Sequence, residues 1–273
     1  MESKCMNKED RYHRNILVEG FGAEGQAKLK VSKALVIGAG GLGSPALLYL
    51  AAAGVGTIGI VDDDIVSITN LQRQILYFTN DLGLQKTDSA QQKLTALNPD
   101  VKIVIYNCQF SEENAEKIIK GYKDESMSNM SFSASCVSPD GEYDFVLSCC
   151  DNYATKLLIN DICVKLKKPY SHGAAVSMRG EAMTYVPGSA CYRCVFNTPP
   201  EDGKLPTSSL TGILGSVAGI IGSIQATEAI KFLVGMNDLL TNRILITDAK
   251  TMNIFSLRIN QNSSCICGDT ILI

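Results

Sequence analysis

The chain has 273 residues, of which 45% are hydrophobic and 19% charged, so its composition excludes a mainly disordered protein. Its 25 basic and 28 acidic residues leave a net charge of −3, which gives no reason to expect a nucleic-acid partner. Its ten cysteines are too few for a disulfide scaffold of this length, so the thiols need another explanation.

The apolar stretches are too interrupted for a secretory signal or a membrane span. Residues 1–15 are polar, and residues 34–61 and 205–227 are broken by glycines or polar side chains. We therefore expect a cytoplasmic chain, in which closely spaced cysteines indicate metal binding or catalysis before disulfides.

Helical and strand patterns alternate along the chain. In order, we expect a helix at 8–31, a strand at 34–37, a helix at 45–53, a strand at 57–61, a helix at 86–97, a strand at 101–106, a helix at 112–120, strands at 145–148 and 181–186, a helix at 212–235 and strands at 243–248 and 253–259. This order predicts an α/β fold, with a Rossmann-like, doubly wound, mostly parallel sheet, helices on both faces and a C-terminal β extension. Residues 121–143 are expected to form a loop or insertion. No linker is visible, so we expect one domain over residues 1–273.

A glycine-rich turn links the first predicted strand to the next helix. It reads Gly38-Ala39-Gly40-Gly41-Leu42-Gly43, and Asp62 ends the following strand. Glycines permit a sharp bend and a close approach of the backbone to phosphate, and the helix start offers free N–H groups to an anion. The turn therefore predicts a nucleotide site, although it does not separate a dinucleotide from ATP, and a packing turn without ligand is the alternative.

Two cations follow this turn in sequence. Arg73 and Lys86 would serve chemistry at a phosphate, where negative charge has to be stabilised, better than they would serve a dehydrogenase. Taken alone, each is equally well explained as a solvated surface charge.

Further motifs occur in order along the chain. They are Asp62-Asp63-Asp64, Thr69-Asn70-Leu71-Gln72-Arg73-Gln74, Lys86, Asp151-Asn152, Gly173-Ala174-Ala175, Cys191-Tyr192-Arg193-Cys194 and Gly222-Ser223-x-Gln225-Ala226-x-Glu228-Ala229-Ile230-Lys231. Together with the glycine turn they resemble the ThiF/MoeB/HesA family, the bacterial relatives of the ubiquitin-activating enzymes. The resemblance covers nearly the whole chain, with residues 121–143 as the main addition.

The resemblance implies an adenylyltransferase that uses ATP and Mg²⁺. Its substrate would be the C-terminal Gly-Gly carboxylate of a ubiquitin-like sulfur carrier, ThiS-like or MoaD-like, in thiamine or molybdopterin biosynthesis. Residues of about 30–165 would bind the nucleotide, and residues of about 166–273 would bind the carrier and zinc. Nothing is expected to be appended to this one adenylation domain.

The resemblance also implies a role for individual residues. Gly41, Asn70 and Arg73 would contact the phosphates, Asp62 the ribose, Lys86 the reacting α-phosphate, and Asp151 would help to place Mg²⁺, with Thr69, Leu71, Gln72 and Asn152 completing the site. Arg14 matches an arginine that family members supply across a dimer interface, so a homodimer is expected.

Two cysteine pairs have the composition of a structural zinc site. Cys191-x-x-Cys194 has zinc-knuckle spacing, and Cys265 and Cys267 would complete a tetrahedral set of four thiolates. The second pair is C-x-C where the family usually has C-x-x-C, with Ser264 in the place of the third cysteine, so thiols without metal are the alternative. Ser208 stands where some family members have a catalytic cysteine, and a serine cannot form an acyl persulfide. The chain is therefore expected to stop at the adenylate.

Two other functions are open on the sequence. A non-catalytic scaffold of the same fold would not need Arg14, Arg73, Lys86 and Asp151 together. A nicotinamide-dependent oxidoreductase would explain the glycine turn and leave the cations and the cysteine pairs unexplained.

Overall fold

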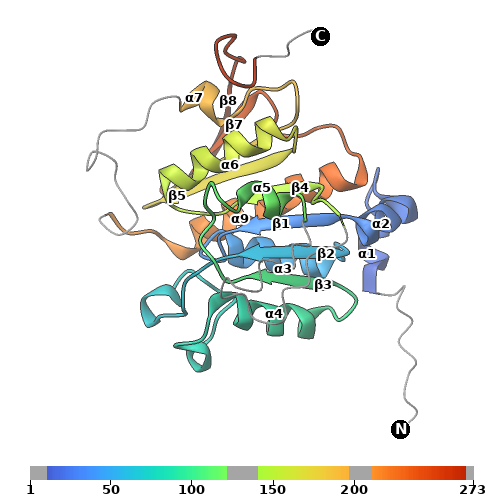
Figure 1. The fold of residues 1–273 in the computed structure, drawn as a ribbon, viewed down its shortest axis with the longest axis vertical. Helices are drawn as coiled ribbons and strands as arrows, with labels where there is room; N and C mark the ends of the chain where they lie inside the picture. The colour runs from blue at the N-terminus through green and yellow to red at the C-terminus, as the bar shows by residue number, and fades with distance from the viewer. Residues whose placement is uncertain (1–10, 122–140, 197–210, 269–273) are drawn as a thin grey trace.

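A single eight-stranded sheet organises the chain in the computed structural model, which describes residues 11–121, 141–196 and 211–268. The strand order is β3-β2-β1-β4-β5-β6-β7-β8 (Figure 1). The strands are β1 (Lys33–Ile37), β2 (Thr57–Val61), β3 (Lys102–Tyr106), β4 (Phe145–Ser148), β5 (Tyr170–Val176), β6 (Arg179–Tyr185), β7 (Arg243–Asp248) and β8 (Asn253–Arg258). The first five strands run parallel, and β6, β7 and β8 continue the sheet antiparallel. The predicted mostly parallel sheet with a C-terminal β extension is confirmed.

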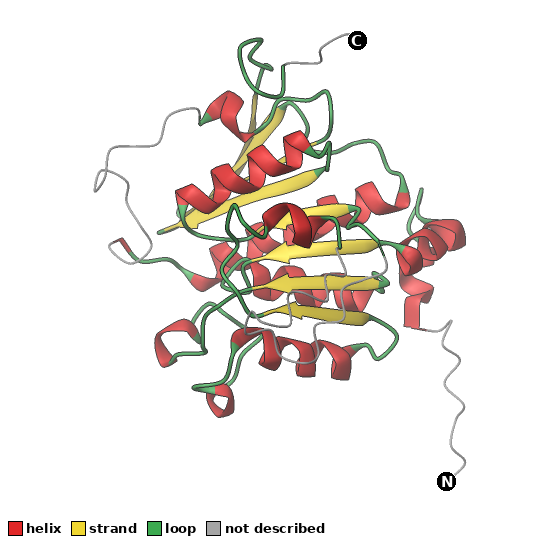
Figure 2. Cartoon of the chain, in the orientation of Figure 1, coloured by secondary structure: helices red, strands yellow, loops and turns green. Residues whose placement is uncertain are grey.

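Helices cover both faces of the sheet (Figures 1 and 2). They are α1 (His13–Ile16), α2 (Gly22–Val31), α3 (Gly43–Ala53), α4 (Lys86–Leu97), α5 (Ala115–Ile119), α6 (Tyr153–Lys165), α7 (Tyr192–Val195) and α9 (Gly215–Val234), with short 3₁₀ turns η2 (Ile68–Asn70) and η3 (Thr79–Asp81). The apolar cores divide accordingly, because α3, α4 and α9 share one cluster of buried side chains and α5, α6 and α7 share the other.

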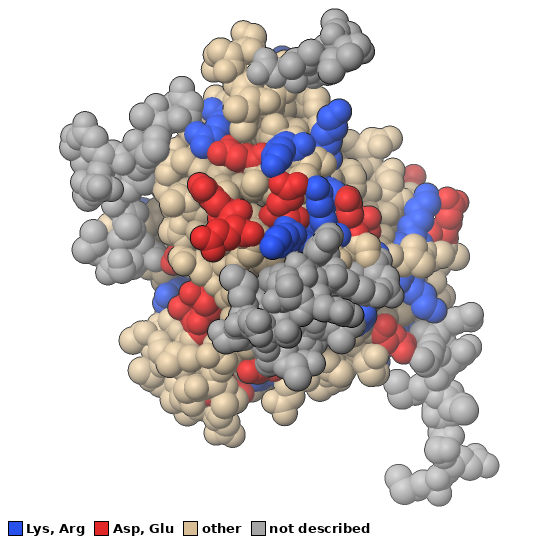
Figure 3. Space-filling model, in the orientation of Figure 1, with Lys and Arg blue, Asp and Glu red and all other residues tan. Residues whose placement is uncertain are grey.

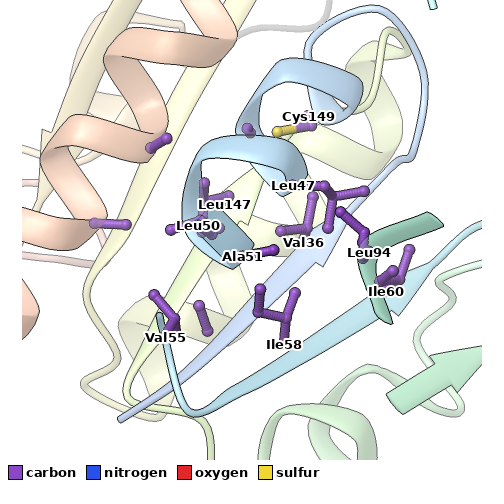
Figure 4. Close-up of a cluster of buried hydrophobic side chains, with 14 of the residues drawn as sticks. Val36, Leu47, Leu50, Ala51, Val55, Ile58, Ile60, Leu94, Leu147 and Cys149 are labelled. Carbon is purple, nitrogen blue, oxygen red and sulfur yellow. The ribbon is translucent and has the colours of Figure 1, made fainter. Parts of the chain in front are cut away.

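The first core lies between α3 and the parallel strands. Val36, Ile58 and Ile60 of the strands pack against Leu47 and Leu50 of α3, and all five are fully buried (Figure 4). Burial of each such side chain contributes roughly 1.5–3 kcal/mol, so this layer fixes the position at which α3 begins. That position is the end of the glycine turn.

Helix α9 is a second wall of this core. By length and composition it could cross a membrane, but 56% of its most apolar window is buried inside the fold, where it packs against α3 and β5. Gly215 and Gly222 allow this close approach, because a Cβ at either position would collide with the backbone of Gln72 or Leu42. At Gly219, by contrast, a Cβ would meet no neighbour within 4 Å.

The opposite face carries mixed charge at its surface. In Figure 3, basic and acidic side chains lie side by side over α5 and α6. Glu116 of α5 pairs with Lys120 and with Lys165 of α6 at 2.7 and 2.6 Å.

The element predictions fail in two places. The helix expected at 8–31 is divided, within residues 11–31, into α1 and α2. Gly20 and Gly22 adopt left-handed φ values of +78° and +61°, which a continuous helix does not allow. The sequence prediction also missed β5, α6 and the short helix α7. Strand β5 contains Ser171, Gly173 and two alanines instead of a β-branched run, which weakens its strand signal.

Candidate functional site

The glycine turn lies at the carboxyl ends of β1 and β4. Gly38 has a φ of +94°, and a Cβ there would lie 2.9 Å from the backbone of Cys149 and Cys150. Helix α3 begins directly after the turn at Gly43, and no side chain caps its first N–H groups. A turn of this shape, followed by uncapped helix N–H groups, is suited to bind phosphate.

Asp62 fastens this turn to the neighbouring strand. Its carboxylate accepts hydrogen bonds from the backbone N–H of Ala39 at 2.7 Å and of Asp64 at 3.0 Å. The Tyr77 hydroxyl donates to the Ala39 carbonyl at 2.8 Å from the other side. Asp62 therefore shapes the turn itself, a role that its sequence position did not reveal.

Lys86 is buried next to two acids. Its ammonium lies 2.7 Å from a carboxylate oxygen of Asp64 and 3.8 Å from one of Asp62, and the side chain is only 4% exposed. Burial raises the pKa of Asp62, and the positive charge of Lys86 opposes that shift. Lys86 is thus the predicted cation beside the turn, and the carboxylates of Asp62 and Asp64 offset its charge.

The segment after η2 places Arg73 over the turn. Its guanidinium donates to the Thr69 carbonyl at 3.0 Å, and a Cβ at Gly41 would touch the Arg73 stem at 3.5 Å. Asn70 accepts a hydrogen bond from the backbone of Ser67 at 3.3 Å. The predicted residues Arg73, Asn70 and Gly41 are therefore brought together.

Other residues of this segment have structural contacts. The Gln72 amide donates to the Ile213 carbonyl at 3.5 Å, and Leu71 packs on the first core. Gln74 was not among the predicted site residues. It is 4% exposed, its Oε1 has no hydrogen-bond partner, and its amide nitrogen lies 3.5 Å from the position of a Cβ on Gly40.

The end of β4 brings a third strand to the same edge. Asp151 is exposed there, and Asn152 caps α6 by accepting a hydrogen bond from the Thr155 N–H at 2.7 Å. An ionised carboxylate at this edge offers the oxygen ligand that Mg²⁺ prefers. Asp62, Asp63 and Asp64 form a separate group of acids whose oxygens lie within 4.8 Å of one another.

Gln225 of α9 supports the strand that carries Asp151. It is fully buried, and its amide donates to the carbonyls of Ser148 at 2.9 Å and Ser171 at 3.3 Å, while its Oε1 lies 3.5 Å from the Cys149 sulfur. A Cβ on Gly173 would collide with this amide. The Gly222-to-Lys231 motif contained Gln225, but only tertiary contacts reveal what it holds.

Arg14 is not brought to this edge within one chain. It is exposed on α1, and the neighbouring Asn15 lies 3.5 Å from the Ala53 carbonyl at the far end of α3. Helix α3 has 11 residues, so about 16 Å separates that end from the glycine turn.

The four predicted zinc ligands are brought together. The sulfurs of Cys191, Cys194, Cys265 and Cys267 all lie within 4.8 Å of one another, with 3.5 Å between Cys191 and Cys265 and 3.4 Å between Cys194 and Cys267. Tetrahedral zinc with bonds of about 2.3 Å requires sulfur separations of about 3.8 Å, so the set fits the metal. Burial raises the pKa of Cys194 to about 11, whereas hydrogen bonds outweigh burial and lower that of Cys267.

Some predicted features lie outside the described residues. These are Ser208 and residues 122–140 of the expected insertion.

Comparison with known proteins gives consistent relatives. The ThiF family matches residues 12–267. The SAMP-activating enzyme E1 of Haloferax volcanii is 38% identical over 95% of this chain and 89% of its own length. The sulfur carrier protein adenylyltransferase of Thermus thermophilus is 38% identical over 95% and 91%. The adenylyltransferase and sulfurtransferase MOCS3 of Aedes aegypti is 37% identical, and the chain spans 58% of its length.

Solved structures agree with the fold. A crystal structure of E. coli MccB with ATP superposes with a TM-score of 0.74 at 23% identity, over 94% of this chain and 73% of MccB. A second structure of MccB, with succinimide, gives a TM-score of 0.78.

Proposed function

The chain belongs to the ThiF family, and from this premise we propose that it is an ATP-dependent adenylyltransferase. Its substrate would be the C-terminal Gly-Gly carboxylate of a ubiquitin-like sulfur carrier, MoaD-like or ThiS-like, in molybdopterin or thiamine biosynthesis in the cytoplasm. The observation that carries the proposal is the meeting of the glycine turn, Arg73, Lys86 and Asp151 at one edge of the sheet. Two relatives of nearly the same length support it, one named as an activating enzyme and the other as an adenylyltransferase.

ATP would bind along this edge. Its phosphates fit the turn at Gly41 and the uncapped start of α3, with Asn70 and Arg73 on the opposite side. Asp62 keeps lone pairs free for a ribose hydroxyl while it holds the turn, because each carboxylate oxygen accepts more than one hydrogen bond. Thr69, Leu71 and Gln72 would support this segment, and Asn152 would do so by capping α6.

The reaction joins two anions. An oxygen of the carrier's carboxylate attacks the α-phosphorus, the bond from that phosphorus to the bridging oxygen breaks, and pyrophosphate leaves with the electron pair. Arg73 and Lys86 lower the repulsion and stabilise the charge of the transition state. Mg²⁺, held through Asp151, would supply further positive charge at the phosphate oxygens.

We propose a homodimer in which Arg14 serves the site of the partner copy. Its position at the far end of α3, about 16 Å from its own glycine turn, supports this, since Arg14 could not act within its own chain. The four cysteines would hold a structural zinc ion that ties α7 to the segment after β8. The carrier would be released as the adenylate, because Ser208 offers no thiol.

Pyrophosphate exchange tests the proposal. Purified protein is mixed with ATP, labelled pyrophosphate and a MoaD-like or ThiS-like carrier, and the label entering ATP is measured. Asp151→Ala and Arg73→Ala should nearly abolish exchange, whereas Asp238→Ala and Arg179→Ala, two exposed matched controls, should retain it. Exchange at the wild-type rate in either site variant would refute the assignment.

The same assay separates the other functions. A scaffold would give no exchange with either carrier, and an oxidoreductase would bind NAD in preference to ATP. Calorimetric binding of ATP and NAD to the wild-type chain distinguishes these two outcomes.

A further inference from the structure

A second buried lysine lies at the carboxyl end of β4, on the face that α6 covers. Lys156 sits on α6, five residues after Asp151, and is 8% exposed. Its ammonium interacts electrostatically with the Cys150 thiol and with the carboxylates of Glu181 and Asp151. Side chains of this kind are rarely so deeply buried unless they are paired.

Lys156 has no such pair. Within residues 11–121, 141–196 and 211–268, its ammonium forms no hydrogen bond and no ion pair. Burial lowers its pKa, which shows that the charge is poorly solvated there. The described residues supply no acceptor for its three N–H donors, and an oxygen acceptor from outside the chain would satisfy them.

One of these two acids, Glu181, is already engaged. Glu181 lies 3.2 Å from Nε2 of His172, and burial lowers the pKa of His172 to about 4, so at neutral pH the uncharged imidazole donates Nε2–H to the carboxylate. This leaves Nδ1 of His172 as an acceptor that is buried without a partner. An unpaired ammonium and an unpaired imidazole nitrogen thus lie on the same face, near Asp151.

These two atoms suit the end of a peptide. A C-terminal carboxylate accepts hydrogen bonds from an ammonium, and the adjacent amide N–H can donate to an imidazole nitrogen. Strand β4, which Asp151 follows, lies between β1, which leads into the glycine turn, and β5, which carries His172. Lys156 interacts electrostatically with Asp151, so a carboxylate bound at Lys156 would lie near the edge of the sheet where we place the phosphates of ATP.

We propose that Lys156 binds the terminal carboxylate of the carrier's Gly-Gly tail and holds it for attack on ATP. The inference rests on the proposed function and adds the residue that recognises the second substrate. Adenylation removes one negative charge from the carboxyl group, so Lys156 binds the substrate more tightly than the acyl product and acts mainly on carrier affinity.

Exchange kinetics with a varied carrier concentration test this role. Lys156→Met should raise the KM for the carrier about tenfold or more, in line with the loss of a charge-assisted hydrogen bond, and leave the KM for ATP within about twofold. Lys156→Arg should restore most of the carrier affinity. Lys165→Met, the same change on the exposed side of α6, should leave both constants unchanged.

A second measurement needs no variant and so does not depend on the folding of one. The wild-type protein should bind the carrier about tenfold more tightly than the same carrier ending in a carboxamide, in calorimetry without ATP. Equal affinity for the two carriers, or an unchanged carrier KM in folded Lys156→Met, would overturn the role of Lys156. Absence of exchange in the wild-type protein with any carrier would instead overturn the proposed function.

Discussion

The two halves of the sheet differ in how their buried lysines are paired. On the nucleotide side, Lys86 is 4% exposed and has Asp64 at 2.7 Å and Asp62 at 3.8 Å. On the side of α6 and the antiparallel strands, Lys156 is nearly as buried and has no partner within the described residues, and four cysteine sulfurs lie within 4.8 Å of one another. The nucleotide side is therefore preorganised by the chain, whereas the other side depends on groups that the chain does not supply.

The difference indicates what each half is built to receive. A matched charge can remain buried before the substrate arrives, because its partner offsets the loss of hydration. A buried charge without a partner lowers the stability of the free protein, and a ligand that pairs with it restores that stability. The stability of the protein then depends on ligand concentration. The cysteine cluster and Lys156 are the two places where this link can be measured.

Loss of one of the four cysteine thiolates should have the largest effect on stability. Cys194→Ser takes away one of the four thiolates, and the remaining three should hold zinc weakly. A ligand present at about 1,000 times its Kd stabilises by about 4 kcal/mol, equivalent to a Tm shift of roughly 8–16 °C in a chain of this size. Metal analysis and thermal unfolding measure both effects.

The matched control is Cys108→Ser, which changes a half-buried thiol outside the cluster. It should keep both the zinc and the Tm. Clearly less than one zinc per chain in wild-type protein purified without added metal would show that the cluster is only a group of thiols.

Removal of the matched lysine should have the next largest effect. Lys86→Met leaves Asp62 and Asp64 without their cation and places two negative charges beside the phosphates. We expect the exchange rate at saturating carrier to fall by roughly 100-fold, as when one donor to a charged transition state is lost.

Lys93→Met is the control for this change, because Lys93 lies on the same helix and is paired with Asp81 at 2.6 Å. It should keep the exchange rate. If Lys86→Met lost carrier affinity alone, Lys86 would act in carrier binding, the role that we infer for Lys156, and not in the reaction step.

The support beneath Asp151 should give a smaller effect. Gln225→Leu leaves the Ser148 and Ser171 carbonyls without their donor, and each buried unpaired group costs about 1–3 kcal/mol. We expect about 2 kcal/mol less stability in urea unfolding, together with a lower exchange rate at unchanged ATP affinity. Gln91→Leu, which loses one bond to the Ile103 carbonyl, should lose less stability and keep the rate.

These contrasts also show how far the sequence could lead. The turn at Gly38, the strands beside it and the cations Arg73 and Lys86 were predictable, because strand, turn and helix are read over a few neighbouring residues. The spacing of Cys191 and Cys194 was informative by itself, and the family resemblance supplied their partners Cys265 and Cys267, which lie more than 70 residues further along the chain. Lys156 and Gln225 were not, since each acquires meaning only from strands that are distant in sequence. The position of Arg14 likewise required knowing at which end of α3 its helix packs.

The smallest effect on stability should come from ion pairs at the exposed surface. Glu116 pairs with Lys120 and Lys165 at the surface, and these hydrogen bonds lower its pKa from 4.5 to about 2. The folded state therefore binds the proton less readily than the unfolded chain, so the stability due to Glu116 is present above pH 4.5 and is lost as the pH falls towards 2.

Glu116→Gln should flatten the decline in Tm between these two values, and the difference should shrink in high salt because exposed pairs are screened. Glu24→Gln, which removes an exposed acid that pairs with Lys28, should flatten it less. A loss of Tm in Glu116→Gln at neutral pH as large as that in Cys194→Ser would contradict the comparison, because stability would then follow surface pairs and not the buried groups.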